Sequence, residues 1–174
     1  SPLIDVVLGP RQVGKTTGIK QILDSHKGLF HYVSADGDVL KPKSWILEQW
    51  SICQGVAANG LLVIDEVQKV ENWSETIKYL WDKQKGDKQK LKVILLGSSS
   101  LQLQKGLSES LTGRFFLHKV HHWGEHESRE AYGLDLKEFL KFGGYPGSYE
   151  FTANTVDWLN YVKTSIVDTV IGKD

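Results

Sequence analysis

The segment "LGPRQVGKTT", from Leu8 to Thr17, decides the fold that this sequence predicts. It holds a glycine, four further residues and then Gly-Lys-Thr, which is the spacing of a phosphate-binding loop. We expect Gly9 and Gly14 to let the backbone turn so that its N–H groups face anionic oxygens, while the following helix contributes the positive end of its dipole. The candidate nucleotide contacts are therefore Gly9, Pro10, Arg11, Gln12, Val13, Gly14, Lys15, Thr16 and Thr17.

Two side chains of this loop carry the predicted chemistry. Lys15 is expected to reach the β- and γ-phosphates of a nucleoside triphosphate, and the Thr16 hydroxyl is expected to ligate Mg²⁺. The flanking sequence agrees, because "LIDVVL" (Leu3–Leu8) predicts a buried strand and "KTTGIKQILDSH" (Lys15–His26) has apolar residues at helical spacing. A loop between a strand and a helix is the context in which this spacing binds phosphate.

The rest of the first 123 residues repeats the alternation of apolar strands and helices. Continuous apolar strands separated by helices predict a parallel α/β sheet that is covered on both faces. The expected strands are Leu3–Leu8, Leu29–Asp36, Gly60–Val67, Leu91–Gly97 and Phe115–Trp123, and the expected helices between them include Lys15–His26, Lys43–Ala57 and Trp73–Lys85.

After Gly124 the pattern becomes helical. A "GGYPG" break (Gly143–Gly147) separates helical stretches, and the last of them is expected over Thr155–Ile171. We therefore expect an ATPase-like core over residues 1–123 and a helical segment over residues 124–174. Because the chain contains no methionine, we also expect it to be a piece of a longer protein, whose C-terminal domain begins in this segment.

Composition narrows the classes of function. Of the 174 residues, 40% are hydrophobic and 24% charged, which suits a chain with a buried core. The formal net charge is zero, so a global basic surface for nucleic acid is not expected. No apolar run approaches the roughly 20 residues that cross a bilayer. The single cysteine, Cys53, fits a reducing, cytoplasmic compartment.

A pair of carboxylates follows the next central strand. "LLVIDE" (Leu61–Glu66) places Asp65 at the carboxyl end of that strand, where ligands of parallel sheets bind. We expect Asp65 to act on Mg²⁺ and Glu66 to polarise the water that attacks the γ-phosphate, as a general base. The alternative interpretation is a solvated strand end.

Two further positions complete the candidate site. In "VILLGSSS" (Val93–Ser100), Ser98 or Ser99 could hold the attacking water or the γ-phosphate, although a helix cap or an ordinary turn explains them equally well. In "SESLTGRFF", Arg114 could neutralise charge on the γ-phosphate, within its own subunit or on a neighbouring one. The alternative for Arg114 is a surface ion pair.

In their order, these motifs resemble the AAA-type ATPases of the additional-strand class. The stretches "GPRQVGKTT", "LLVIDEVQKV", "LLGSSS", "ESLTGRF" and "FGGYPG" look more closely like a widespread bacterial and archaeal family that joins an AAA domain to a C-terminal domain of unknown function. The resemblance implies a sheet of order 5-1-4-3-2, ATP as the nucleotide and Arg114 as an arginine finger. It also implies an arginine in the lid, yet Arg129 is the only arginine after Arg114 and lies in no recognisable pattern.

Together these features predict an enzyme, an ATPase that depends on Mg²⁺ and drives an attached C-terminal module. The alternative is a nucleotide-gated binding module with negligible turnover. A DNA-acting motor is a weaker alternative, because the neutral charge does not favour it. Expected partners are ATP and ADP, an unidentified protein client and a possible second copy of the chain, with DNA less favoured and no membrane.

Overall fold

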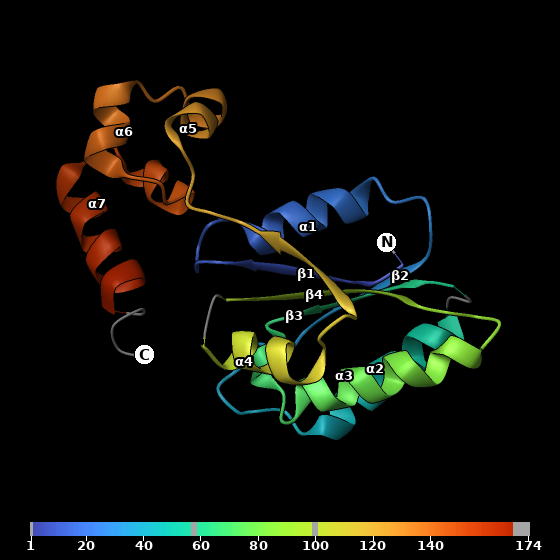
Figure 1. The fold of residues 1–174 in the computed structure, drawn as a ribbon. Helices are drawn as coiled ribbons and strands as arrows, with labels where there is room; N and C mark the ends of the chain where they lie inside the picture. The colour runs from blue at the N-terminus through green and yellow to red at the C-terminus, as the bar shows by residue number, and fades with distance from the viewer. Residues whose placement is uncertain (1, 57–58, 99–100, 169–174) are drawn as a thin grey trace. The chain divides into compact units, whose positions relative to one another are not determined.

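The computed structural model describes residues 2–56, 59–98 and 101–168, and within them it contains an α/β sheet followed by a helical segment (Figure 1). The strands are β1 Ile4–Gly9, β2 Phe30–Ser34, β3 Leu61–Asp65, β4 Lys92–Ser98 and β5 Phe115–Lys119. The α-helices are α1 Lys15–Asp24, α2 Lys43–Val56, α3 Trp73–Lys83, α4 Leu101–Ser110, α5 Glu125–Tyr132, α6 Leu136–Phe142 and α7 Thr155–Tyr161. Shorter helical turns are η1 Val67–Lys69, η2 Gln84–Gly86, η3 Pro146–Phe151 and η4 Val162–Val167.

The sheet has the order β2-β3-β4-β1-β5, and all its strand pairs are parallel. Read from the other edge this is 5-1-4-3-2, so both the predicted parallel sheet and the implied order are confirmed. The last strand ends earlier than the predicted Trp123. The Val120 N–H still donates to the Leu8 carbonyl, but the Trp123 N–H donates to Gly144, so the chain has left the sheet by then.

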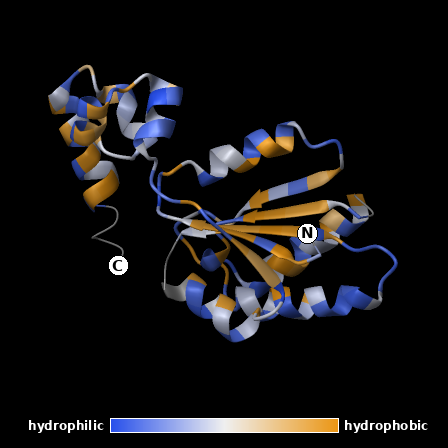
Figure 2. Ribbon diagram, turned by 45° about the horizontal axis from the view of Figure 1, so that its top comes forward, coloured by the Kyte–Doolittle hydropathy of each residue, from blue (hydrophilic) through white to orange (hydrophobic). Residues whose placement is uncertain are grey.

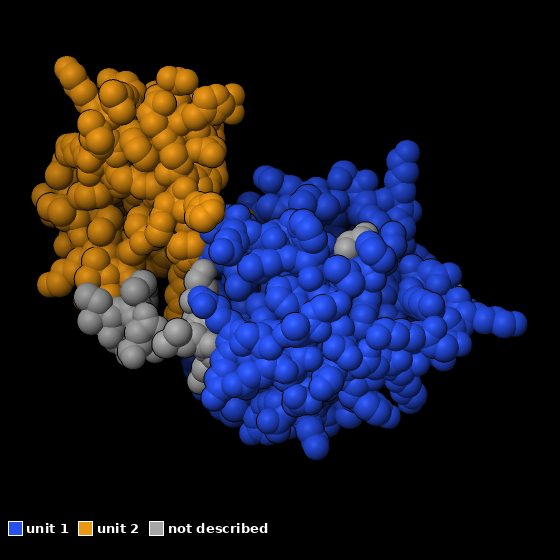
Figure 3. Space-filling model, viewed as in Figure 1, with its two compact units in different colours: residues 1–9, 15–120 blue, residues 10–14, 121–174 orange. Residues whose placement is uncertain are grey.

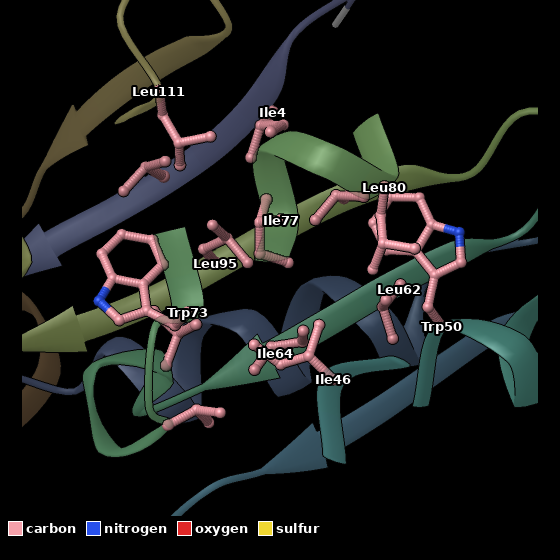
Figure 4. Close-up of a cluster of buried hydrophobic side chains, with 14 of the residues drawn as sticks. Ile4, Ile46, Trp50, Leu62, Ile64, Trp73, Ile77, Leu80, Leu95 and Leu111 are labelled. Carbon is pink, nitrogen blue, oxygen red and sulfur yellow. The ribbon is translucent and has the colours of Figure 1, made fainter. Parts of the chain in front are cut away.

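Each face of the sheet is covered by helices. On one face, α2, α3 and α4 bury apolar side chains against alternate residues of the strands, such as Leu62 and Ile64 (Figures 1 and 4). On the other face, Ile19 and Leu23 of α1 pack against Leu61, Val63 and Leu96. Because β3 is buried on both faces, its sequence is continuously apolar rather than alternating, as Figure 2 shows for the central strands.

The helical segment after the sheet has a small apolar core of its own. Leu134, Phe142 and Tyr149 are buried there and pack with Trp123 and Trp158. The predicted helix over Thr155–Ile171 begins where expected, but its hydrogen bonding changes to a π-helix at η4, and residues 169–171 lie outside the described residues. None of the described helices combines the length and the apolar character needed to span a membrane.

The chain divides into two compact units (Figure 3). The first consists of residues 1–9 and 15–120, and the second of residues 10–14 and 121–174. The middle of the phosphate-binding loop thus belongs by its contacts to the second unit. Within that unit, the Trp123 indole N–H donates to the Val13 carbonyl at 3.1 Å, and the Gln12 amide donates to the Ser165 carbonyl.

Candidate active site at the carboxyl ends of the central strands

The candidate site lies at the edge of the sheet where β1, β3 and β4 end. Gly9 pairs in register with Ser98, so the last residues of β1 and β4 are neighbours, and β3 ends next to β4 in Asp65. Asp65 and Ser98 are only 3% and 6% exposed. Buried polar side chains need hydrogen-bond partners, and the partners of these two define the site.

The glycines of the loop serve different purposes. Gly14 has a φ of +88°, a left-handed conformation that glycine adopts without strain. Gly9 does not, since it is the last residue of β1. A Cβ on Gly9 would lie 2.4 Å from the carbonyl oxygen of Val120, so glycine is required for the close approach of the chain beside β5. The other positive φ in the loop, +61°, belongs to Gln12.

Lys15 and Thr16 open helix α1, directly after the loop. Lys15 is buried to 9% exposure, and its ammonium group donates to the Gly9 carbonyl at 3.0 Å. The Thr16 hydroxyl donates to Oδ2 of Asp65 at 2.6 Å. The structure therefore brings the loop hydroxyl and the carboxylate of β3 together, although 49 positions separate them in the sequence.

The Asp65 carboxylate is held from two further directions. The backbone N–H of Glu66 donates to its Oδ1 at 2.9 Å, and the hydroxyl of Tyr32 on β2 donates to its Oδ2 at 2.9 Å. Burial, together with this hydrogen bond to Asp65, raises the pKa of Tyr32 well above its usual range. Tyr32 therefore remains a neutral donor at physiological pH. Tyr32 was not among the predicted site residues, because a tyrosine inside a predicted strand carries no motif.

Glu66 adopts an unusual backbone conformation. Its φ and ψ of 53° and 40° are left-handed, which costs a non-glycine residue energy and is commonest at functional positions. The turn η1 follows at once and returns Gln68 toward Glu66. The Gln68 amide donates to Oε2 of Glu66 at 2.5 Å and lies 3.4 Å from Oγ of Ser98. Gln68 was not among the predicted site residues.

The two serine candidates have different outcomes. Ser98 is the last residue of β4, buried, and close to Gln68. It belongs to the strand itself, in contrast to the alternative of a cap or an ordinary turn. Ser99 lies outside the described residues.

The structure does not bring Arg114 to this site within one chain. Arg114 precedes β5, and its carbonyl accepts from the N–H of Ile4, at the opposite end of β1 from Gly9. With a rise of about 3.3 Å per residue, these two ends of β1 are roughly 16 Å apart. Within one chain, the parallel strands therefore place Arg114 at the amino edge of the sheet, away from the candidate site at the carboxyl edge.

The partner of Arg114 within its own chain is a carboxylate. Its guanidinium donates to both oxygens of Asp82 on α3, with Nη2–Oδ2 at 2.8 Å, and to the Thr112 carbonyl. Arg114, assisted by Lys85, lowers the pKa of Asp82 to about 2. Asp82 is therefore ionised at physiological pH and holds the guanidinium at the amino edge.

Comparison with known families gives a match over most of the chain. The model of a family described as "AAA domain" matches residues 1–140. The chain belongs to the AAA domain family. The matched range of this AAA domain includes the loop, both carboxylates, Ser98 and Arg114.

Relatives of this AAA domain include an uncharacterised protein of Methanocaldococcus jannaschii. The two are 30% identical over 145 residues, which make up 82% of this chain but 29% of that protein. The AAA domain thus spans less than a third of the length of this relative.

Among solved structures, the AAA domain is similar to the RuvB Holliday junction branch migration motor of Thermotoga maritima. That structure has 21% sequence identity and a TM-score of 0.54, and the match covers 74% of this chain and 41% of the motor. A variant of the same motor gives a TM-score of 0.55 at the same identity. At this identity the likeness concerns the fold, which is that of a P-loop ATPase.

Proposed function

We propose that this AAA domain binds ATP and hydrolyses it in a Mg²⁺-dependent reaction. The observation that carries the proposal is the 2.6 Å hydrogen bond between Thr16 and Asp65, with Lys15 and Glu66 as their chain neighbours. A phosphate-binding loop and a second carboxylate beside the metal-binding one are the parts needed to transfer a γ-phosphoryl group to water. RuvB, described as a motor, supports the proposal through its shared fold.

The residues present fit a magnesium ion. Mg²⁺ prefers hard oxygen ligands, keeps several waters and binds through one or two protein groups plus phosphate oxygens. Thr16 and Asp65 supply a hydroxyl and a carboxylate oxygen in contact with each other. They would hold the ion, which when bound neutralises charge on the β- and γ-phosphates.

Tyr32 gives this assignment a test. Because Tyr32 orients the Asp65 carboxylate, Tyr32→Phe is expected to raise the Mg²⁺ concentration for half-maximal ATP hydrolysis roughly tenfold, as for other partners of metal ligands. A Mg²⁺ titration at saturating ATP measures the effect. Tyr79→Phe removes an exposed hydroxyl on α3 and is the control. An unchanged Mg²⁺ requirement in Tyr32→Phe would contradict the role of Tyr32.

The remaining roles follow from charge and position. Lys15, at the positive end of α1, would attract the β- and γ-phosphates and stabilise the charge that the γ-phosphate gains during transfer. Glu66 would accept a proton from the attacking water, and Ser98 would contact that water or the γ-phosphate. Ser99 stays a candidate for the same contact.

Arg114 fits the proposal only as a residue that acts on a neighbouring copy. We infer that the AAA domain self-associates, so that the amino edge of one copy meets the nucleotide of the next. Arg114→Ala and Lys15→Ala are each expected to be inactive, while an equimolar mixture should regain activity at interfaces that pair an intact arginine with an intact loop. Phosphate release after mixing measures this. A mixture as inactive as its components would argue against catalysis across subunits.

The experiment that tests the proposal is phosphate release from ATP by the wild-type chain, with Mg²⁺ and with excess chelator. Mg²⁺-dependent release over several turnovers is expected. A single turnover with excess protein separates hydrolysis from the alternative, a nucleotide-gated switch, in which intact ATP would persist for hours. We also propose that the energy drives an attached C-terminal module, beginning near residue 124, that acts on a protein client.

A further inference from the structure

The amide of Gln68 lies between the two groups assigned to the attacking water. Its Nε2 donates to Oε2 of Glu66 at 2.5 Å and is 3.4 Å from Oγ of Ser98. Three elements converge here: the end of β3, the turn η1 and the end of β4. A single NH₂ group can donate two hydrogen bonds, so one side chain can serve both neighbours.

The orientation of this amide is set by its surroundings. If the amide were flipped, its oxygen would face the carboxylate of Glu66, and two acceptors would meet without a hydrogen. The Oε1 atom instead points toward the backbone of β4, where a Cβ on Gly97 would lie only 2.5 Å away. Glycine at this position leaves the space that the Gln68 amide occupies.

The fixed orientation matters because Glu66 would otherwise be free to move. Glutamate is long, is only partly buried here, and loses rotamer freedom when it is held in one place. A general base is effective only within hydrogen-bond reach of the proton that it takes. The Gln68 hydrogen bond restricts the carboxylate to a position beside Ser98.

We propose that Gln68 is a positioning residue. It holds the Glu66 carboxylate beside the Ser98 hydroxyl, so that the general base and the serine act on the same water. This inference rests on the proposed function, because it assigns Gln68 a part in the same hydrolysis. Gln68 acts through Glu66 and is not among the residues assigned to the nucleotide or to the metal ion. Its removal should therefore slow the chemical step and leave the binding of ATP intact.

Two variants test the inference. Gln68→Leu has a similar volume and no donor, and Gln68→Glu keeps the shape but turns an acceptor toward Glu66. For both we expect kcat to fall roughly 10- to 100-fold, the range seen when a supporting partner of a functional group is lost. KM for ATP and the affinity for a fluorescent ATP analogue should stay within about twofold. Gln54→Leu, an exposed position on α2, is the matched control.

A double-mutant cycle separates positioning from mere packing. In a Glu66→Gln background there is no base to position, so adding Gln68→Leu should change the residual hydrolysis rate by less than about twofold. A packing role would lower that rate by the same factor as in the wild-type background and would lower Tm. Either that result or wild-type kcat in both single variants would overturn the inference.

The outcomes also distinguish this inference from the proposed function. If the wild-type chain releases no phosphate, the proposed function fails and the role of Gln68 fails with it. If the wild-type chain turns over and the Gln68 variants match it, only the inference fails.

Discussion

Lys15→Ala is expected to lower the affinity for ATP at least about 100-fold. The variant removes a buried ammonium group at the start of α1, which is the group that we propose to bind the β- and γ-phosphates. Charge-assisted hydrogen bonds contribute about 1.5–3 kcal/mol each, and two phosphates would lose their partner. Titration with a fluorescent ATP analogue, with Mg²⁺ present, measures the loss.

The fold should tolerate this change. In the structure the Lys15 ammonium donates to the Gly9 carbonyl, and a hydrogen bond from a charged donor contributes about 1.5–3 kcal/mol to the free energy of unfolding, less than the total stability of a typical domain. A thermal melt should therefore still show one cooperative transition. Lys27→Ala removes an exposed lysine just after α1 and should bind like wild type. If Lys15→Ala binds ATP as tightly as this control, the loop does not hold the nucleotide.

Glu66→Gln is expected to bind ATP normally and to hydrolyse it about 1000-fold more slowly. Glutamine keeps the length of the side chain but cannot accept the proton from water, and general base catalysis contributes roughly 10²- to 10⁴-fold. Asp65, Thr16 and Lys15 are unchanged in this variant, so the affinity for ATP should be retained. A single-turnover assay with excess protein measures the rate directly.

The matched control is Glu71→Gln, an exposed position beyond η1. It should hydrolyse ATP at the wild-type rate. Normal turnover by Glu66→Gln would show that another group activates the water. Slow decay of ATP in wild type and both variants alike would favour the nucleotide-gated switch.

Much of the fold could be predicted because the central strands are buried on both faces. Such strands are apolar on both faces, as in "LLVI" (Leu61–Ile64) of β3, and that pattern distinguishes them from the amphipathic helices between them. The ends were harder to predict. The shift to a π-helix after Tyr161 depends on hydrogen-bond geometry that no spacing of apolar residues reveals.

The sequence could predict those site residues whose position is determined by the direction of the parallel strands. Asp65 and Ser98 are the last residues of neighbouring parallel strands, and Thr16 follows the end of β1 after a short loop, so the three lie at one edge of the sheet. The same rule applied to Arg114 would have placed it at the amino edge, since it precedes its strand.

Tyr32 and Gln68 could not be found in this way. Tyr32 becomes part of the site only through its hydrogen bond to Asp65. Gln68 becomes part of it only through its hydrogen bonds to Glu66 and Ser98. The sequence offers only a weak signal for Gln68, a polar residue soon after two carboxylates. The sequence offers no signal for Tyr32, because tyrosine is common in β-strands whether or not it has a function.

The contacts of Gln12 and Val13 have a practical consequence for dividing the gene. A cut after Val120 would keep the whole sheet and every side chain assigned to catalysis. It would nevertheless remove Trp123 and Ser165, which hydrogen-bond this stretch of the loop. A single cut in the sequence therefore cannot separate the two compact units, because residues 10–14 belong to the second one. The shortest chain that retains both hydrogen bonds extends at least to Ser165.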